Sequence, residues 1–158
     1  MTTTDISLAR FYQGWETYQG YLTDAIAPLT SEQLTLRATP NLRSIGLLAA
    51  HIIAARVVWF HAVMGEGLAD LMPMRTWDDY DPIQQNAAEL VAGLEVTWSL
   101  IQQCLARWTS ADLDQTFQQR DGPVSRQWII WHVIEHDLYH GGELFLTCGM
   151  HGLPVPDL

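Results

Sequence analysis

The chain has 158 residues, of which 48% are hydrophobic and 16% are charged. This length and composition exclude intrinsic disorder and predict a single domain over residues 1–158, with a buried core. Eighteen acidic residues outnumber eight basic residues, all of them arginine, so the formal net charge is −10. Such a charge repels nucleic-acid phosphates and anionic membrane surfaces, so we expect a small-molecule substrate, with no nucleic acid or membrane as partner.

The start of the chain and its two cysteines bear on where the protein is found. The first residues, MTTTDISLAR, lack a basic region followed by an apolar one, so we expect no export signal. We identify no apolar run of the roughly 18 residues that a membrane span needs. Cys104 and Cys148 are too few for a disulfide framework, and each falls in an apolar helical pattern typical of buried thiols. These features predict a cytoplasmic protein.

Hydrophobic periodicity predicts two helices in the first part of the chain. Across residues 5–27, apolar side chains recur at intervals of three and four, and Pro28 ends the pattern. Ser44 then occupies an N-cap position ahead of a second apolar helix that runs to Gly65. His51 lies near the middle of this second helix, which its composition predicts to be largely buried.

Two further helices are predicted in the remainder of the chain. Residues 65–81 carry glycines, a proline and several acidic side chains, which indicates an irregular connector. Pro82 opens a third helix that extends to about residue 108. After an Asp-Gly-Pro turn, a fourth helix covers residues 125–148, and Gly149 ends it. No segment has a convincing strand pattern, so four helices of roughly 20 to 25 residues predict an all-α fold, a four-helix bundle.

The most informative motif lies in the predicted fourth helix. His132, His136 and His140 are spaced four residues apart in a run that is otherwise largely apolar. On a helix each such step rotates by about 40° and rises by about 6 Å, so the three imidazoles form a slowly drifting stripe on one face. Two of them on successive turns can bind one metal ion, if at least one more ligand comes from elsewhere. His51 is the best candidate for that ligand.

A plain structural explanation competes with metal binding. A lone histidine on an apolar helix face is ordinarily a hydrogen-bonded core residue, and a helical protein with protonatable core histidines remains an alternative. Several buried imidazoles, however, each lose their hydration, and protonated rings would repel one another. A divalent cation resolves both costs, so the sequence favours a metal site.

The ligand types restrict the chemistry of such a site. Ferritin-like di-iron proteins need a glutamate from each of two helices and Glu-x-x-His motifs on the other two, and this chain lacks that pattern. An all-imidazole set suits zinc, nickel, copper or ferrous iron. Three protein ligands leave a position for water, whose pKa can fall to about 7, or for a thiol that binds as its thiolate.

Two runs of sequence, and the distance between them, resemble a known family, and the resemblance covers nearly the whole chain. The run Ser44–His51 and the run Trp131–Glu143 are similar to those of the DinB/YfiT-like metalloenzyme family. The resemblance implies a four-helix bundle with one histidine from the second helix and a His-x-x-x-His pair from the fourth. Carried over by position, the metal ligands are His51, His136 and His140. The resemblance further implies a divalent metal ion, with zinc or nickel expected first and iron or manganese as alternatives.

Three residues beside the implied ligands are candidates for other roles. The resemblance assigns His132, one turn before the ligand pair, to the pocket and not to the metal. Glu143 departs from the family's usual glutamine, and either orients a ligand imidazole and takes a proton, or lies solvated near the helix end. We expect His132 and Glu143 to act as catalytic residues. Tyr139 either packs in the protein interior or hydrogen-bonds substrate.

The resemblance implies a reaction class and leaves alternatives open. Characterised proteins similar to this family use a metal to activate a low-molecular-weight thiol, so we expect a thiol-dependent S-transferase or isomerase. A metal-dependent hydrolase that uses hydroxide is the nearest alternative. A non-catalytic, stress-related protein that binds a metal or small ligand is the other. We also expect a homodimer, because two-fold dimers are the commonest soluble oligomers.

Overall fold

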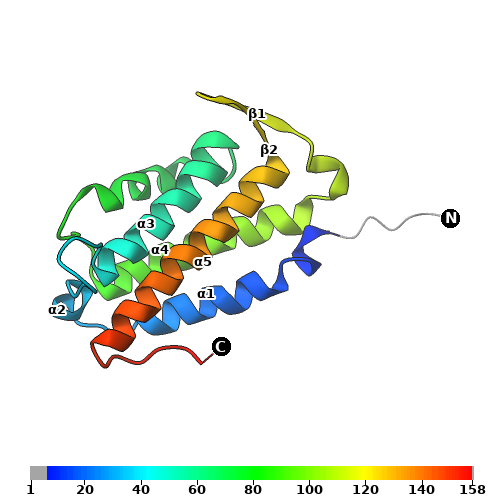
Figure 1. Cartoon of the computed structure of the whole chain (residues 1–158). Coiled ribbons are helices and arrows are strands. Elements are labelled where there is room, and N and C mark those ends of the chain that lie inside the picture. The colour runs from blue at the N-terminus through cyan, green and yellow to red at the C-terminus, as the bar shows by residue number, and fades with distance from the viewer. Residues whose placement is uncertain (1–6, 158) are drawn as a thin grey trace.

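The computed structural model describes residues 7–157, and this part of the chain is mostly helical, as predicted (Figure 1). Its four long helices are α1 (Gln13–Ile26), α3 (Ile45–Arg56), α4 (Ala87–Arg107) and α5 (Arg126–Met150). The π-helix Val57–Val63 continues α3 without a break. The shorter elements are the 3-10 helices Leu8–Arg10, Ala69–Asp79 and Ser110–Asp112, α2 (Ser31–Leu34), and strands β1 (Thr116–Gln119) and β2 (Gly122–Ser125).

The long helices pack side by side around an apolar interior (Figure 1). Helix α3 contacts α4, α5 and the 3-10 helix Ala69–Asp79, and α1 covers α4 and part of α5. The interior is filled mainly by branched aliphatic side chains from all four helices. Its fully buried members include Leu22, Ile26, Ile52, Ile53, Leu90, Leu94, Ile101 and Ile129.

Helix α3 and its π-helical continuation form the most apolar segment. By length and composition, the 19 residues Ile45–Val63 could cross a membrane, so the expectation that no apolar run reaches this length was wrong. Within the qualifying window 67% of the residues are buried inside the protein. Burial of this extent is typical of a core helix surrounded by its neighbours, which explains why the segment is apolar on all sides.

Side-chain caps mark several helix boundaries, and three boundaries differ from the prediction. Ser44 and Ser125 accept hydrogen bonds from backbone amides in the first turns of α3 and α5, as N-caps do. Helix α4 begins at Ala87 and not at Pro82, because Asn86 and Glu89 form a reciprocal capping box there. Helix α5 continues past Gly149 to Met150. The predicted start of the first helix at Asp5 lies outside the described residues, but within them α1 begins only at Gln13, after the separate 3-10 helix Leu8–Arg10.

A short β-hairpin precedes α5, although no strand was predicted. Strands β1 and β2 pair antiparallel, with Thr116 opposite Ser125 and Gln119 opposite Gly122. Gly122 has a φ of 117°, which a residue with a side chain rarely adopts. Each strand has four residues and few β-branched side chains, so the local pattern carries too little signal to predict it.

A buried ion pair joins α3 to α5. Arg56 Nη2 donates to Asp137 Oδ2 at 2.7 Å, and the two side chains are 1% and 0% exposed. Trp15 Nε1 of α1 donates to the same carboxylate at 2.8 Å, and Gln19 accepts from Arg56 Nη1 at 2.8 Å. Asp137 directly follows His136, so this network fixes the rotation of α5 at the histidine stripe.

Candidate metal centre

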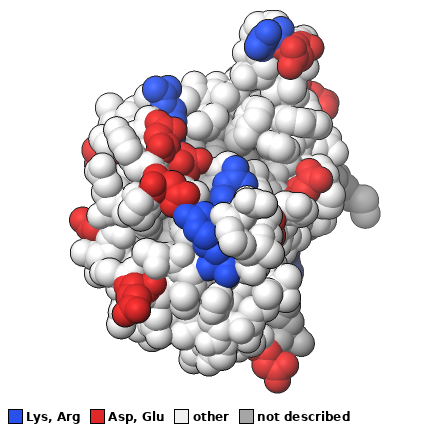
Figure 2. Space-filling view, turned by 60° about the vertical axis from the view of Figure 1, so that its left-hand side comes forward, with Lys and Arg blue, Asp and Glu red and all other residues white. Residues whose placement is uncertain are grey.

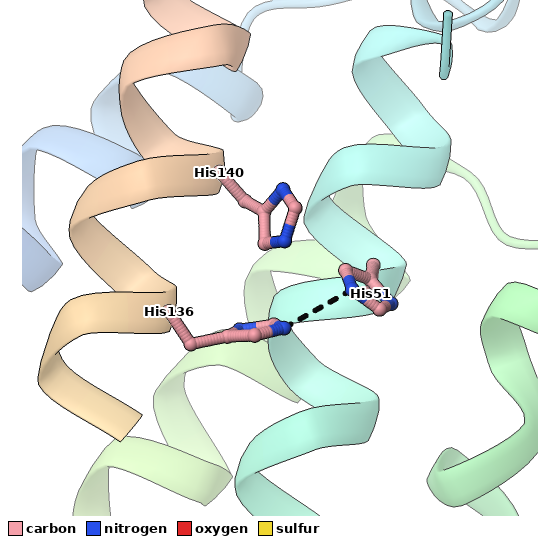
Figure 3. Close-up of side chains that lie close together, drawn as sticks. All are labelled: His51, His136 and His140. Carbon is pink, nitrogen blue, oxygen red and sulfur yellow. Dashed lines mark hydrogen bonds between the residues drawn. The ribbon is translucent and has the colours of Figure 1, made fainter. Parts of the chain in front are cut away.

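Helices α3 and α5 bring three partly buried histidines together in the space between them (Figure 3). His136 and His140, one turn apart on α5, extend toward His51 on α3. One ring nitrogen from each residue can be chosen so that all three lie within 4.8 Å of one another. The ring centroids are 4.5 to 4.7 Å apart. These are the residues that the family resemblance implied as ligands, and their arrangement could hold one metal ion.

Two carboxylates determine which nitrogen of His51 and His140 is available. Asp78 Oδ2 lies 2.6 Å from His51 Nδ1, and Glu143 Oε2 lies 2.6 Å from His140 Nδ1. An ionised carboxylate only accepts, so Nδ1 donates its proton in each pair and the Nε2 lone pair stays free. Metal-binding histidines are commonly oriented by carboxylates in this manner, which also raises the basicity of the ring.

His136 differs from the other two because no carboxylate holds it. Its Nε2 lies 3.0 Å from His51 Nε2, and its buried Nδ1 has no hydrogen-bond partner among the described residues. Two lone pairs that face each other at this distance repel, unless a proton or a cation lies between them. The donor set and the two facing Nε2 atoms therefore fit a divalent cation.

Burial favours the neutral form of His136 and His140, which is the form that coordination requires. Loss of hydration, followed by the nearby rings of His140, His51 and His132 and the charge of Arg43, lowers the pKa of His136 to about 3. Burial is also the largest influence on His140 and lowers its pKa, although the hydrogen bond to Glu143 acts in the opposite direction. Protons therefore compete weakly for these nitrogens near neutral pH.

The expected pocket residues lie at different places around this cluster. His132 is separate from it, with its ring centroid 6.3 Å from that of His136, and it stacks on Trp128 at 4.7 Å. Tyr139 is mostly exposed, and its ring meets His140 edge-on at a centroid distance of 4.9 Å. Glu143 contacts His140 directly, which is the arrangement expected if it orients a ligand imidazole.

Asp78 was not identified from the sequence. It lies in residues 65–81, for which an irregular connector was predicted, whereas Ala69–Asp79 forms a 3-10 helix that packs on α3. The 3-10 helix places this carboxylate against His51, 27 positions away along the chain. The surrounding acidic and aromatic residues have no spacing that distinguishes Asp78 from its neighbour Asp79.

A cavity of about 480 Å³ adjoins the histidine cluster. Glu143, which contacts His140, forms part of its wall, and Leu48 lines it one turn before His51 on α3. Its full lining is Ala38, Asn41, Leu42, Arg43, Leu48, Glu143, Leu146 and Thr147. Arg43 and Glu143 are the charged members, so the cavity offers both signs of charge near the candidate metal site.

Comparison with known proteins gives one family and two similar solved structures. The family model described as the DinB superfamily matches residues 13–144. No curated protein matches the chain. A DinB-like protein from Bacillus cereus has 20% identity and a TM-score of 0.76, with coverage of 98% of this chain and 99% of that one. A conserved protein from Enterococcus faecalis has 14% identity and a TM-score of 0.69, with coverage of 90% and 95% respectively. At these identities the two structures support the fold alone.

Proposed function

This chain belongs to the DinB superfamily, and we propose that it is a divalent-metal-dependent enzyme whose ion is bound by His51, His136 and His140. The observation that supports the proposal is the convergence of three imidazoles, two of which present Nε2 because carboxylates hold Nδ1. Under this proposal the four long helices form the family's four-helix bundle and residues 1–158 form one domain. A cytoplasmic location and a homodimer remain predictions.

The donor set limits the choice of ion. Three neutral nitrogens favour zinc or nickel, with iron as an alternative, because imidazole suits these borderline cations. Manganese, the other alternative that the family resemblance implied, prefers oxygen ligands and fits this donor set less well. Within residues 7–157, the three histidines are the cluster whose geometry could hold an ion. A single site with three protein ligands leaves room for a substrate or water, whereas structural zinc sites ordinarily have four protein ligands.

We propose a thiol-dependent S-transferase or isomerase as the reaction class. When bound, the ion would act as a Lewis acid that favours the thiolate form of a thiol near neutral pH. The chain's own residues orient the ligands and transfer protons. Asp78 and Glu143 hold the rings of two ligand histidines, and Glu143 and His132 exchange protons with the reacting groups. The adjoining cavity is large enough for a low-molecular-weight thiol.

The same site would also suit hydrolysis, because water can take the place of a thiol. The non-catalytic alternative is a protein that only binds a metal or a small ligand. An S-transferase or isomerase acts with a thiol, a hydrolase splits its substrate with water, and a non-catalytic protein turns over neither substrate. A reaction screen therefore distinguishes these candidates.

The test has two stages. Elemental analysis of the untagged protein should find about one divalent ion per chain, and this ion should be lost in His136→Gln but retained in the control His61→Gln. His61 serves as the control because its Nδ1 is bonded to the carbonyl of Glu66, outside the cluster. The loaded protein is then assayed with thiols plus electrophiles and with hydrolysable esters and amides. Absence of a stoichiometric ion would overturn the metal site. If an ion is bound but no substrate is turned over, the protein is a non-catalytic binder.

A further inference from the structure

The cavity beside the histidine cluster is lined by an arginine that forms no ion pair among residues 7–157. Arg43 lines the cavity, and it forms no hydrogen bond or ion pair with any other residue in the range 7–157. By contrast, the neighbouring Arg37 pairs with Asp81 and donates to the carbonyl of Leu42. Arg43 is exposed, so its guanidinium is accessible to a ligand that enters the cavity.

Position relates this guanidinium to the candidate metal site. Arg43 immediately precedes Ser44, the N-cap of α3, and His51 lies two turns into that helix. Glu143 links the two places, because it lines the cavity together with Arg43 and its Oε2 lies 2.6 Å from His140 Nδ1. One small molecule in the cavity could therefore contact Arg43 at one end and approach an ion bound by the histidines at the other.

The other polar groups of the cavity form no hydrogen bond with the guanidinium of Arg43, and Glu143 and Thr147 have partners of their own. Glu143 is the cavity's acidic residue, and its Oε2 already accepts from His140 Nδ1 at 2.6 Å. Thr147 donates its hydroxyl to the backbone carbonyl of Glu143 at 2.7 Å. Asn41 provides an amide at the cavity wall. Figure 2 shows one face of the molecule, where arginine side chains gather near the middle beside a group of acidic side chains.

From these observations we propose that the substrate of this site carries an anionic group, which Arg43 binds in the cavity while the reacting end of the molecule lies at the histidines. The inference rests on the proposed metal-dependent function and adds the chemical class of the substrate. A guanidinium matches carboxylate and phosphate through paired N–H donors, which a lysine does not. Arg43 thus determines specificity, and the ion with its ligands carries the chemistry.

The first experiment measures thiol binding to the cobalt(II)-loaded protein through the thiolate-to-cobalt absorption band. The probes are 3-mercaptopropionate and 3-mercapto-1-propanol, which have equal chain lengths and differ in charge. We expect the anionic thiol to bind at least about ten-fold more tightly than the neutral thiol, because a charge-assisted hydrogen bond contributes at least that difference in affinity. Arg43→Gln should abolish this preference. The control Arg120→Gln, which removes the same charge at the exposed hairpin turn, should retain it.

A second experiment does not depend on metal binding. Metal-free protein is titrated with succinate, inorganic phosphate and succinamide, with ligand-observed NMR as the readout. The inference is supported if either anion binds, succinamide does not bind, and Arg43→Gln weakens the binding of the anion. The anion that binds then identifies the anion type. Equal binding of neutral and anionic probes, or an unchanged preference in Arg43→Gln, overturns it. Failure to bind cobalt would contradict the proposed function alone, because the metal-free titration still reports on Arg43.

Discussion

Asp78 Oδ2 lies 2.6 Å from His51 Nδ1, which links the 3-10 helix Ala69–Asp79 to the candidate metal centre. The carboxylate accepts a hydrogen bond from the Nδ1–H group of His51, so it holds the ring with Nε2 directed toward His136. His140 has an equivalent partner in Glu143, which comes from its own helix. The two carboxylates thus orient rings that lie on different helices.

This relationship predicts that Asp78→Asn weakens metal binding without loss of a ligand. Loss of a carboxylate that orients a metal-binding histidine typically lowers metal affinity by about 10- to 100-fold. The measurement is zinc competition with a chromophoric chelator at fixed pH. The control Asp79→Asn changes the adjacent carboxylate and should leave affinity unchanged. Equal affinities in wild type and Asp78→Asn would show that the hydrogen bond does not orient the ligand.

The buried pair of Arg56 and Asp137 predicts a large loss of stability on removal of one charge. Asp137→Asn leaves Arg56 buried without a counter-charge, which costs about 3–5 kcal/mol of unfolding free energy. Urea denaturation of the metal-free protein measures this effect. The more exposed pair of Arg37 and Asp81 provides a matched comparison, and Asp81→Asn should cost less than about 1 kcal/mol. Similar losses in both variants would contradict this explanation.

The lowered pKa of His136 predicts how acid affects the metal-free protein. In the unfolded chain this ring takes a proton near its ordinary pKa of about 6.5, whereas in the folded protein the pKa is about 3. Between these values the unfolded state binds more protons, so stability falls as the pH falls through this window. Urea midpoints after chelation should therefore decline between pH 7 and pH 5, and His136→Gln should decline less. Parallel declines would show that another group is responsible.

The exposed face of α5 predicts the site of self-association. Trp131 is 61% exposed, and Leu138, Leu146 and Met150 also expose apolar surface along this helix. If the protein is a homodimer, burial of this face would stabilise it, and Trp131→Glu should shift the protein toward monomer. Light scattering during size-exclusion chromatography measures the mass. The control Leu68→Glu replaces another exposed apolar side chain, 73% exposed, that lies outside α5. A dimer that persists in Trp131→Glu would place the interface elsewhere.

Much of the fold follows from local patterns that the sequence displays directly. The positions of α5, and of α3 with its π-helical continuation, were predicted to within a few residues, because Ser44 and Ser125 are side-chain caps and the apolar spacing is regular. The start of α4 was misplaced, since the capping box of Asn86 and Glu89 outweighs the preference of proline for a first turn. The hairpin was missed because each of its two strands has only four residues, and their composition alone does not predict that they pair.

The sequence by itself determined that His136 and His140 share a helix face, because four-residue spacing dictates this wherever a helix forms. It also indicated His51 as their partner, through the likeness of two separated motifs to one family. Only the tertiary structure decided what surrounds these rings. Asp78 reaches His51, and Arg43 and Glu143 meet at one cavity, through contacts between segments that are distant along the chain. Such contacts depend on how whole helices pack, and no local periodicity encodes them.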